Sequence, residues 1–163
     1  MITLYILRHG DAGDPLPGPD DDLRELTTKG RNQARTAGRF LKSIGAGVEV
    51  VLSSPLPRAL QTARLAAAEL AEKPEVRVCE SLACGARLGD FQSEILRSGC
   101  DVVLVVGHQP DLGELIHTLT GAHTVLKKGA LARIRCDAVE PGAGLLDWLA
   151  PPKLLDAGSL GAS

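Results

Sequence analysis

The stretch LYILRHG at residues 4–10 runs from four largely apolar side chains into a basic pair and a glycine. An uninterrupted apolar run of this kind is typical of a strand that is buried on both faces, as in a parallel sheet. Arg8 and His9 follow the run directly, so we expect them at the carboxyl edge of the sheet, where parallel strands place their ligand-binding loops. Gly10 has no side chain to block a ligand there, and it is free to adopt a positive φ.

Helix and strand patterns alternate along the chain after this first strand. Residues 11–22 are rich in Gly, Pro and Asp and predict a loop. We interpret the acidic run in this loop as solvated, in preference to a rim that selects substrates. Thr27 or Thr28 is expected to cap a helix that ends at Gly45 and Gly47.

The rest of the chain continues the alternation. A second strand is expected at residues 48–52, followed by a helix that Ser54 caps and in which Pro55 lies in the first turn. Later patterns predict strands near residues 76–79, 102–106, 130–136 and 145–149, a helix around residues 91–97, a helix beginning at Pro110 and a partly loose tail from Pro151.

Alternating helices and strands that are apolar throughout predict an α/β protein. The expected architecture is a three-layer sandwich, with a central, mainly parallel sheet and helices on both faces. The 163 residues contain no internal repeat and no linker, which favours a single domain over residues 1–163. Aromatic residues make up only 2% of the chain, so the core must be built from Leu, Val, Ile and Ala.

Composition argues against several classes of partner. A formal net charge of −2 gives no electrostatic footprint for nucleic acid, and the scarcity of aromatic side chains removes the stacking surfaces that single strands need. No stretch approaches the ~20 apolar residues of a membrane span. The first apolar run is short and lacks the basic start of a signal peptide. We therefore expect a cytoplasmic protein that binds neither nucleic acid nor membrane.

The four cysteines, Cys79, Cys84, Cys100 and Cys136, form no CxxC pair and have no histidine at metal-ligand spacing. We expect them to be free and to pack as small hydrophobic side chains. No cluster of Asp and His at metal spacing is present in the sequence either, so we expect no metal site.

Three loops predicted at the carboxyl edge of the sheet carry basic or imidazole groups. Arg8 and His9 follow the first strand, Arg58 follows the second, and His108 follows the strand at residues 102–106. Taken singly, Arg58 could be a solvated helix residue and His108 a hydrogen-bonded histidine. Arg58 also lies in the first turn of its helix, where free backbone N–H groups favour an anion. Together these four side chains predict a site for a phosphoryl group.

Four motifs in this order resemble a known family: RHG at residues 8–10, LTTKG at 26–30, SSPLPRALQTA at 53–63 and GH at 107–108. Their order and spacing are similar to those of the histidine phosphatase (phosphoglycerate mutase-like) superfamily. The short chain, the form GHQP at 107–110 and the segment WLAPPKL at 148–154 most resemble its SixA-type phosphohistidine phosphatases.

The resemblance implies that His9 is a nucleophile that becomes transiently phosphorylated. It also implies that Arg8, Arg58 and His108 bind the phosphoryl oxygens beside Gly10. Neutrality of the nucleophile fits, because neighbouring arginines disfavour a further positive charge on the ring. A guanidinium grips two oxygens through a planar fork, which lysine cannot do. The arginines would take the place of a metal ion, so no cofactor is expected.

The implied activity is that of a hydrolase in signal transduction, which releases phosphate from a protein phosphohistidine. The protein would be a histidine phosphotransfer domain or a phosphotransferase-system carrier. Larger members of the superfamily use an acidic proton donor after the third strand. Here Glu80 occupies that region, and we interpret it as structural in preference to catalytic. A phosphorylated imidazole leaves more readily than an alkoxide, so a missing acid favours phosphohistidine over a sugar phosphate.

Chain length supports the same substrate, because few residues remain for a lid and an open site can admit a side chain of a folded protein. Two alternatives stay open. The first is a general small-molecule phosphomonoesterase or phosphomutase of the same superfamily. The second is a non-catalytic phosphoprotein-binding module, which the presence of His9 disfavours. A nucleotide-binding protein is disfavoured further, because the chain has no GxGxxG and no Walker lysine loop.

Overall fold

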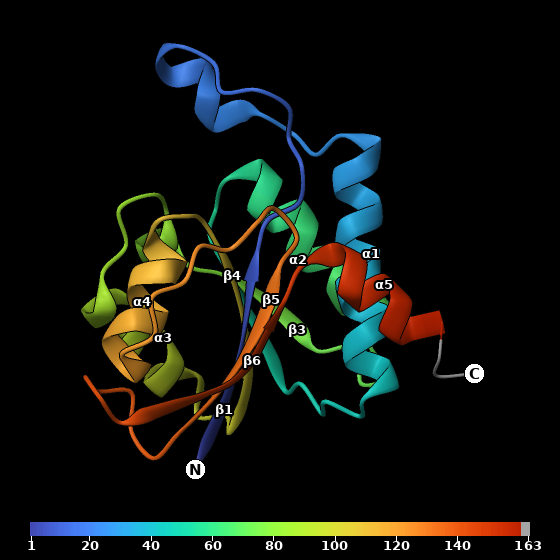
Figure 1. Cartoon of the computed structure of the whole chain (residues 1–163). Coiled ribbons are helices and arrows are strands. Elements are labelled where there is room, and N and C mark those ends of the chain that lie inside the picture. Colours follow the sequence, from blue (N-terminus) through green and yellow to red (C-terminus); the bar gives the residue numbers. More distant parts are fainter. Residues whose placement is uncertain (161–163) are drawn as a thin grey trace.

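The computed structural model describes residues 1–160, and the side chains of residues 1–158. Within this part of the chain, six strands form one mixed sheet in the order β3-β2-β4-β1-β5-β6 (Figure 1). The strands are β1 (Ile2–Arg8), β2 (Val50–Ser53), β3 (Glu75–Val78), β4 (Val102–Gly107), β5 (Leu131–Cys136) and β6 (Gly144–Ala150). Three of the five strand pairs within residues 1–160 are parallel, which confirms the predicted, mainly parallel sheet.

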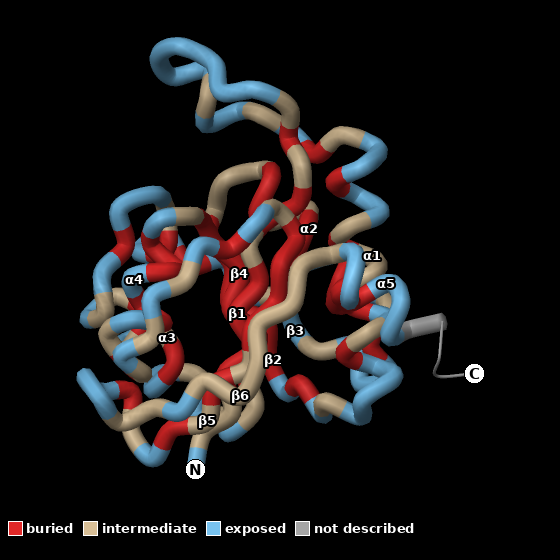
Figure 2. The backbone as a smooth tube through the Cα atoms, viewed as in Figure 1, coloured by how far each residue is buried: buried red, intermediate tan, exposed pale blue. Residues whose placement is uncertain are grey.

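Helices cover both faces of this sheet, so the predicted three-layer sandwich is confirmed. The helices are α1 (Thr28–Ser43), α2 (Pro57–Glu69), α3 (Leu88–Ser98), α4 (Asp111–Thr120) and α5 (Pro152–Leu160). Figure 1 shows α1, α2 and α5 on one side of the sheet and α3 and α4 on the other. Figure 2 shows the central strands as the buried layer between them.

The apolar run of β1 serves two cores at once. Leu4 and Ile6 belong to the cluster that also contains residues of α3 and α4. Tyr5 and Leu7 belong to the cluster formed with α1, α2 and α5. Successive side chains of a strand point to opposite faces, so a strand between two helical layers must be apolar at every position. The core is built mainly from Leu, Val, Ile and Ala, as expected, with Phe91 as its largest fully buried side chain among the described residues.

The predicted start of the first helix is confirmed, and the predicted start of the second helix is wrong. Thr27 caps α1, because its hydroxyl accepts a hydrogen bond from the backbone N–H of Gly30 at 3.1 Å. The second helix does not start after Ser54. It starts at Pro57, and the preceding Leu56 has no side-chain capping bond. The Ser54 hydroxyl is engaged with another residue of the candidate site, described below.

The tail from Pro151 is not loose over its described part. Residues Pro152–Leu160 form α5, which packs against α1. Leu155 is fully buried in the cluster shared with α1 and α2. Burial of an apolar side chain against a neighbouring helix overrides the weak helix propensity of a Gly- and Ser-containing segment. The final residues 161–163 lie outside the described part of the chain.

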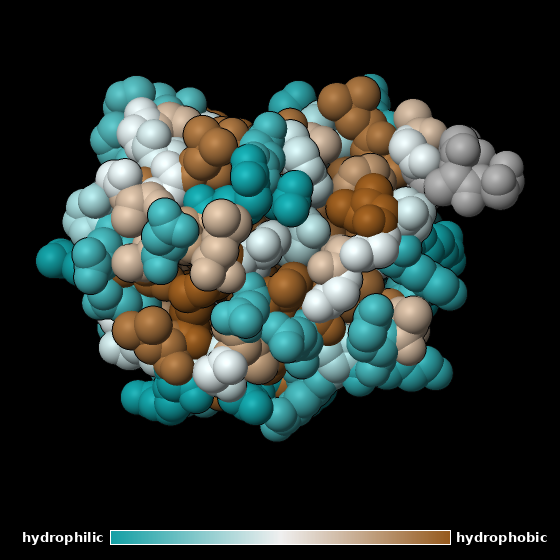
Figure 3. All heavy atoms as spheres, turned by 90° about the horizontal axis from the view of Figure 1, so that it is seen from below, coloured by the Kyte–Doolittle hydropathy of each residue, from teal (hydrophilic) through white to brown (hydrophobic). Residues whose placement is uncertain are grey.

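Two surface features bear on function. The segment after β1 contains a short 3₁₀ turn, η1 (Gly18–Leu23), that extends beyond the carboxyl edge of the sheet (Figure 1). At the opposite end, hydrophobic side chains form separate patches among hydrophilic ones (Figure 3). Among the described residues, no helix combines the length and the apolar character needed to cross a bilayer.

Candidate active site

The carboxyl ends of β1, β2 and β4 bring the sequence-predicted site residues together. The backbone N–H of His9 donates to the carbonyl of Gly107 at 3.1 Å, and that of Ser54 donates to Val106 at 3.1 Å. These bonds fix the ends of three parallel strands at one edge. The rings of His9 and His108 have their centroids 5.2 Å apart, tilted by 57°. The charges of Arg8 and Arg58 act on both rings.

The His9 ring is held in one orientation by its own loop. Its Nδ1 lies 2.8 Å from the carbonyl oxygen of Gly10, which can only accept, so Nδ1 carries the proton and Nε2 has a free lone pair. Burial lowers the pKa of His9 to about 3, against the raising effect of the Gly10 bond, and the positive charge of nearby groups lowers it further. The ring is therefore neutral near pH 7 and can act as a nucleophile through Nε2.

The His108 ring is oriented by Ser54. Its Nε2 lies 2.7 Å from the Ser54 hydroxyl, which also accepts the backbone N–H of Leu56 at 3.2 Å. The hydroxyl proton can donate to Nε2, and on this basis we assign the ring proton of His108 to Nδ1. Nδ1 is buried and has no partner among the described residues. Burial, followed by the charge of Arg58, lowers the pKa of His108 to about 4, so the neutral ring offers one free N–H.

The two arginines are fixed but incompletely paired. Arg8 donates through Nη1 to the carbonyl of Leu126 at 2.8 Å. Arg58, which is 3% exposed, donates through Nη1 to the carbonyl of Asp21 at 3.0 Å. The Nε atoms of both arginines are buried and have no partner among the described residues. A buried N–H without a partner costs free energy, so these groups are available donors for a bound anion.

The arrangement of two imidazoles and two guanidinium groups agrees with the similarity of the chain to known proteins. The family model described as "Histidine phosphatase superfamily (branch 1)" matches residues 4–83. Phosphohistidine phosphatase SixA of Escherichia coli is 31% identical over 156 residues, which cover 93% of this chain and 94% of that protein. The chain belongs to the histidine phosphatase superfamily.

Two further proteins are similar to this histidine phosphatase over most of their length. An uncharacterized protein of Picosynechococcus sp. is 42% identical over 145 residues, which cover 84% of this chain and 87% of that protein. The solved structure of the protein histidine phosphatase SixA complexed with tungstate superimposes with a TM-score of 0.82 at 28% identity, covering 94% of this chain and 99% of that chain. The fold and the family together make the protein a phosphatase.

Gly10 has a packing role in this histidine phosphatase that the sequence does not reveal. It does not adopt a positive φ, and its backbone N–H already donates to the Thr62 hydroxyl at 3.1 Å. Thr62 in turn donates to the carbonyl of Arg58 at 2.7 Å, which joins the His9 loop to α2. A Cβ at Gly10 would lie 2.4 Å from the carbonyl oxygen of Gly30. Glycine is required here because α1 approaches the loop closely.

The reciprocal contact predicts that Gly30→Ala is strongly destabilising. A Cβ at Gly30 would lie 2.0 Å from the carbonyl oxygen of Asp11, which is backbone and cannot move away freely. We expect the free energy of unfolding, measured in urea, to fall by about 2–3 kcal/mol. Gly89→Ala in α3 is the matched control, because no neighbouring atom of the described segments lies within 4 Å of its Cβ position, and we expect it to be neutral or slightly stabilising. Equal effects of the two substitutions would contradict this account.

The acidic loop is not simply solvated, contrary to the sequence-based interpretation. Besides its carbonyl contact, Asp21 places its carboxylate 3.9 Å from Nη2 of Arg58 and accepts from Nε of Arg24 at 2.8 Å. The charge of Arg24 also lowers the pKa of His108. The segment at residues 11–24 therefore borders the site. The three-residue spacing of Asp21 and Arg24 was the sequence feature that could have indicated an ordered loop.

Glu80 lies apart from the four candidate site residues. Glu80 begins the short turn η2 (Glu80–Leu82), its side chain is exposed, and no contact within residues 1–160 joins it to the four site residues.

All four cysteines are free. Cys84 is nevertheless exposed, with Sγ 3.7 Å from Nη2 of Arg58, so the expectation that every cysteine packs as a small hydrophobic side chain is wrong for Cys84. The described residues contain no cluster of three or more His, Cys, Asp or Glu side chains that could hold a metal ion.

The neutral histidines predict a loss of stability as the pH falls. In the unfolded chain each ring takes up a proton near pH 6.5, whereas the folded pKa values are about 3 for His9 and about 4 for His108. Between these values the unfolded state binds more protons, so stability decreases on acidification. We expect the free energy of unfolding to be lower at pH 5 than at pH 7 by on the order of 1–2 kcal/mol for each histidine.

Urea unfolding at the two pH values checks this prediction, with the double variant His9→Asn/His108→Gln as the control. Asp11 and Asp147 do not contribute between pH 5 and pH 7 in the folded protein. Hydrogen bonding to Thr27 lowers the pKa of Asp11, and hydrogen bonding to Arg135 lowers that of Asp147, so both titrate below pH 5. The double variant should lose most of the pH dependence. A wild-type stability that is equal at pH 5 and pH 7 would show that these rings are not buried in the neutral form.

Proposed function

We propose that residues 1–163 form one histidine phosphatase domain that removes the phosphoryl group from a protein phosphohistidine through a covalent intermediate on His9. The observation that carries this proposal is the neutral His9 ring, with Nδ1 held by the Gly10 carbonyl and Nε2 unprotonated. Beside it lie two guanidinium groups whose Nε atoms, and an imidazole whose Nδ1, have no partner within the described part of the chain. Tungstate is a tetrahedral oxyanion like phosphate, and the related SixA structure that contains tungstate supports an oxyanion site in this fold.

Phosphoryl transfer to His9 needs no proton donor when the substrate is phosphohistidine. Nε2 of His9 attacks phosphorus in line, the bond between phosphorus and the substrate imidazole breaks, and that imidazole leaves as a neutral ring if its other nitrogen carries a proton. Water then attacks the phosphorylated His9, which releases dihydrogen phosphate and restores the ring with its Nδ1 proton. Throughout, Arg8, Arg58 and His108 donate to the three phosphoryl oxygens, and each donor supplies about 3–4 kcal/mol in the transition state.

The position of Glu80 supports phosphohistidine over a sugar phosphate. An alkoxide leaving group needs a proton, and the sequence offered Glu80 as its source. Its side chain is exposed in η2 and makes no contact with the four site residues within the described chain. Glu80 therefore does not supply the acid that a small-molecule phosphomonoesterase or phosphomutase would need, whereas a phosphoramidate would not require one.

Phosphate release from three substrates tests the proposed function. The substrates are a phosphorylated histidine phosphotransfer domain, a phosphorylated phosphotransferase-system carrier and glucose 6-phosphate. We expect kcat/KM for at least one phosphohistidine protein to exceed that for the sugar phosphate by about 100-fold or more, which corresponds to the help an alkoxide would need from a general acid. Comparable values would favour the phosphomonoesterase, and retention of the phosphoprotein without phosphate release would indicate a binding module.

Metal independence gives a separate expected result. Because the arginines supply the positive charge that a metal ion provides in other phosphoryl-transfer sites, EDTA should leave kcat and KM unchanged. The measurement is the steady-state rate before and after dialysis against the chelator. A loss of activity that one divalent cation restores would contradict the proposal.

A further inference from the structure

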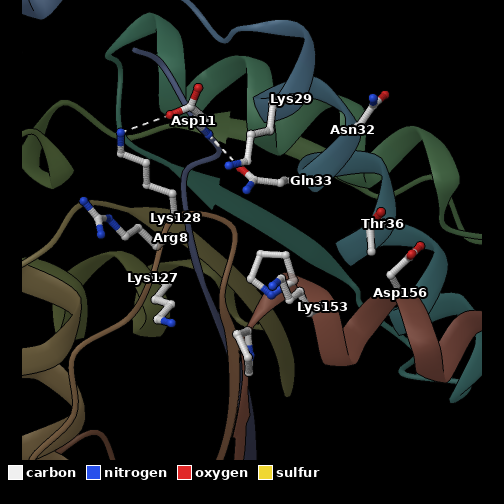
Figure 4. Close-up of a pocket in the computed structure, with 12 residues that line it drawn as sticks. Arg8, Asp11, Lys29, Asn32, Gln33, Thr36, Lys127, Lys128, Lys153 and Asp156 are labelled. Carbon is white, nitrogen blue, oxygen red and sulfur yellow. Dashed lines mark hydrogen bonds and ion pairs between the residues drawn. The ribbon is translucent and has the colours of Figure 1, made fainter. Parts of the chain in front are cut away.

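A cavity of about 940 Å³ lies beside the candidate active site, where β1, α1, α5 and the loop before β5 meet. Arg8 lines it, whereas His9, Arg58 and His108 do not. Figure 4 shows side chains from these separate segments around this space. Arg8 therefore belongs both to the candidate phosphoryl site and to the wall of the cavity, so the cavity adjoins the place where a phosphoryl group would bind.

Positive charge is concentrated around this cavity. Lys29, Lys127, Lys128 and Lys153 line it together with Arg8, and the described lining residues include two carboxylates. One of these, Asp11, already accepts from Nζ of Lys128 at 3.1 Å and from the Thr27 hydroxyl at 2.7 Å. The whole chain carries a formal charge of −2, so this local excess of cations is opposite in sign to the protein as a whole.

Two of the lysines lie at helix positions where a positive charge is destabilising. Lys29 lies in the first turn of α1 and Lys153 in the first turn of α5, and neither first turn contains an acidic residue. The positive end of the helix dipole disfavours cations there. Local choices that work against stability are expected at binding sites. Both side chains are exposed at the cavity and can reach a ligand.

We infer that this cavity receives carboxylate side chains that flank the phosphohistidine on the substrate protein. The inference rests on the proposed function and names the surface chemistry of its substrate. Lysine ammonium groups on flexible stems are point charges that pair with several carboxylates in varied positions, whereas recognition of a second phosphate favours fixed, planar forks. Complementary charge next to the phosphoryl site would speed association with an acidic protein and select against basic ones.

Two synthetic phosphohistidine peptides test the inference, one with Glu on both sides of the histidine and one with Gln at the same positions. We expect wild-type kcat/KM to be about 10-fold or more higher for the Glu peptide at low ionic strength, and the difference to shrink in 0.5 M NaCl (about 4 Å Debye length). Lys127→Glu/Lys153→Glu should abolish or invert the preference. Arg64→Glu/Lys73→Glu, an equal charge change at exposed positions outside the cavity, should preserve it.

Failure of this inference can be told apart from failure of the proposed function. Equal kcat/KM for the two peptides, or a preference that survives Lys127→Glu/Lys153→Glu, would overturn the inference while phosphohistidine hydrolysis stands. If neither peptide is hydrolysed, the proposed function is in question. Binding of the unphosphorylated, fluorescently labelled peptides then tests whether the cavity receives carboxylate side chains. Tighter binding of the Glu peptide, lost in the Lys127→Glu/Lys153→Glu protein, would support it, and equal binding of the two peptides would overturn it.

Discussion

His9→Asn should leave a folded protein that has lost phosphatase activity. Asparagine keeps an N–H donor near the Gly10 carbonyl that His9 Nδ1 occupies at 2.8 Å, but it has no nucleophilic nitrogen at the position of Nε2. Without the nucleophile only binding and charge stabilisation remain, so kcat for a phosphohistidine peptide should fall by about 10⁴-fold or more. Steady-state phosphate release measures the loss, and thermal unfolding with circular dichroism shows whether the fold is retained.

His117→Asn is the matched control for this substitution. His117 is exposed in α4 and stacks on His123, with ring centroids 4.2 Å apart, so its replacement removes an imidazole away from the candidate site. Activity of the His117→Asn protein should equal that of the wild type. A folded His9→Asn protein with wild-type kcat would remove His9 from the role of nucleophile.

Arg58→Ala should lower kcat and raise KM together. The Arg58 guanidinium is buried, and no described residue pairs with its Nε, so a phosphoryl group would gain a charged donor both in the bound state and in the transition state. Removing one such donor costs about 10²–10³ in kcat. Arg58→Lys should recover little of this loss, because an ammonium group cannot reproduce the fork that pairs with two oxygens.

Inhibition by tungstate and a control substitution on the same helix test whether Arg58 acts in the oxyanion site. Arg58 also donates to the Asp21 carbonyl, so its removal will loosen the segment at residues 11–24 to some extent. Inhibition by tungstate reports the oxyanion site directly and should weaken along with kcat/KM. Arg64→Ala, on the same helix and exposed, should change neither quantity. An Arg58→Ala protein with kcat within 3-fold of wild type (about 0.65 kcal/mol) would contradict the proposed role.

Much of the fold could be predicted because its signals are local. The run at residues 4–7 and the run VVLVVG at 102–107 are apolar at every position, and both are central strands between two helical layers. Thr27 has a capping hydroxyl three residues before the N–H that it accepts, which is a pattern visible in sequence. The convergence of Arg8, His9, Arg58 and His108 followed from the rule that parallel strands direct their loops to one edge.

The errors arose where a contact joins residues far apart in the chain. The Ser-Pro pair at 54–55 is typical of a helix start, but the Ser54 hydroxyl bonds to His108. The glycine at position 10 suggested a need for a positive φ, whereas glycine is required there because the backbone of Gly30 leaves no room for a side chain. The acidic run suggested a solvated loop, but Asp21 contacts Arg58 across 37 positions. No local pattern encodes these partners, because they depend on the packing of complete elements.

The central claim is that the phosphoryl group passes through His9. Rapid quenching of the enzyme with a phosphohistidine peptide, followed by mass spectrometry under alkaline conditions that preserve phosphohistidine, tests it most directly. We predict that a phosphoryl group appears on His9 within the first turnover and that the His9→Asn protein acquires none. A phosphoryl group found on another residue, or phosphate released steadily with His9 unmodified at every quench time, would contradict the claim.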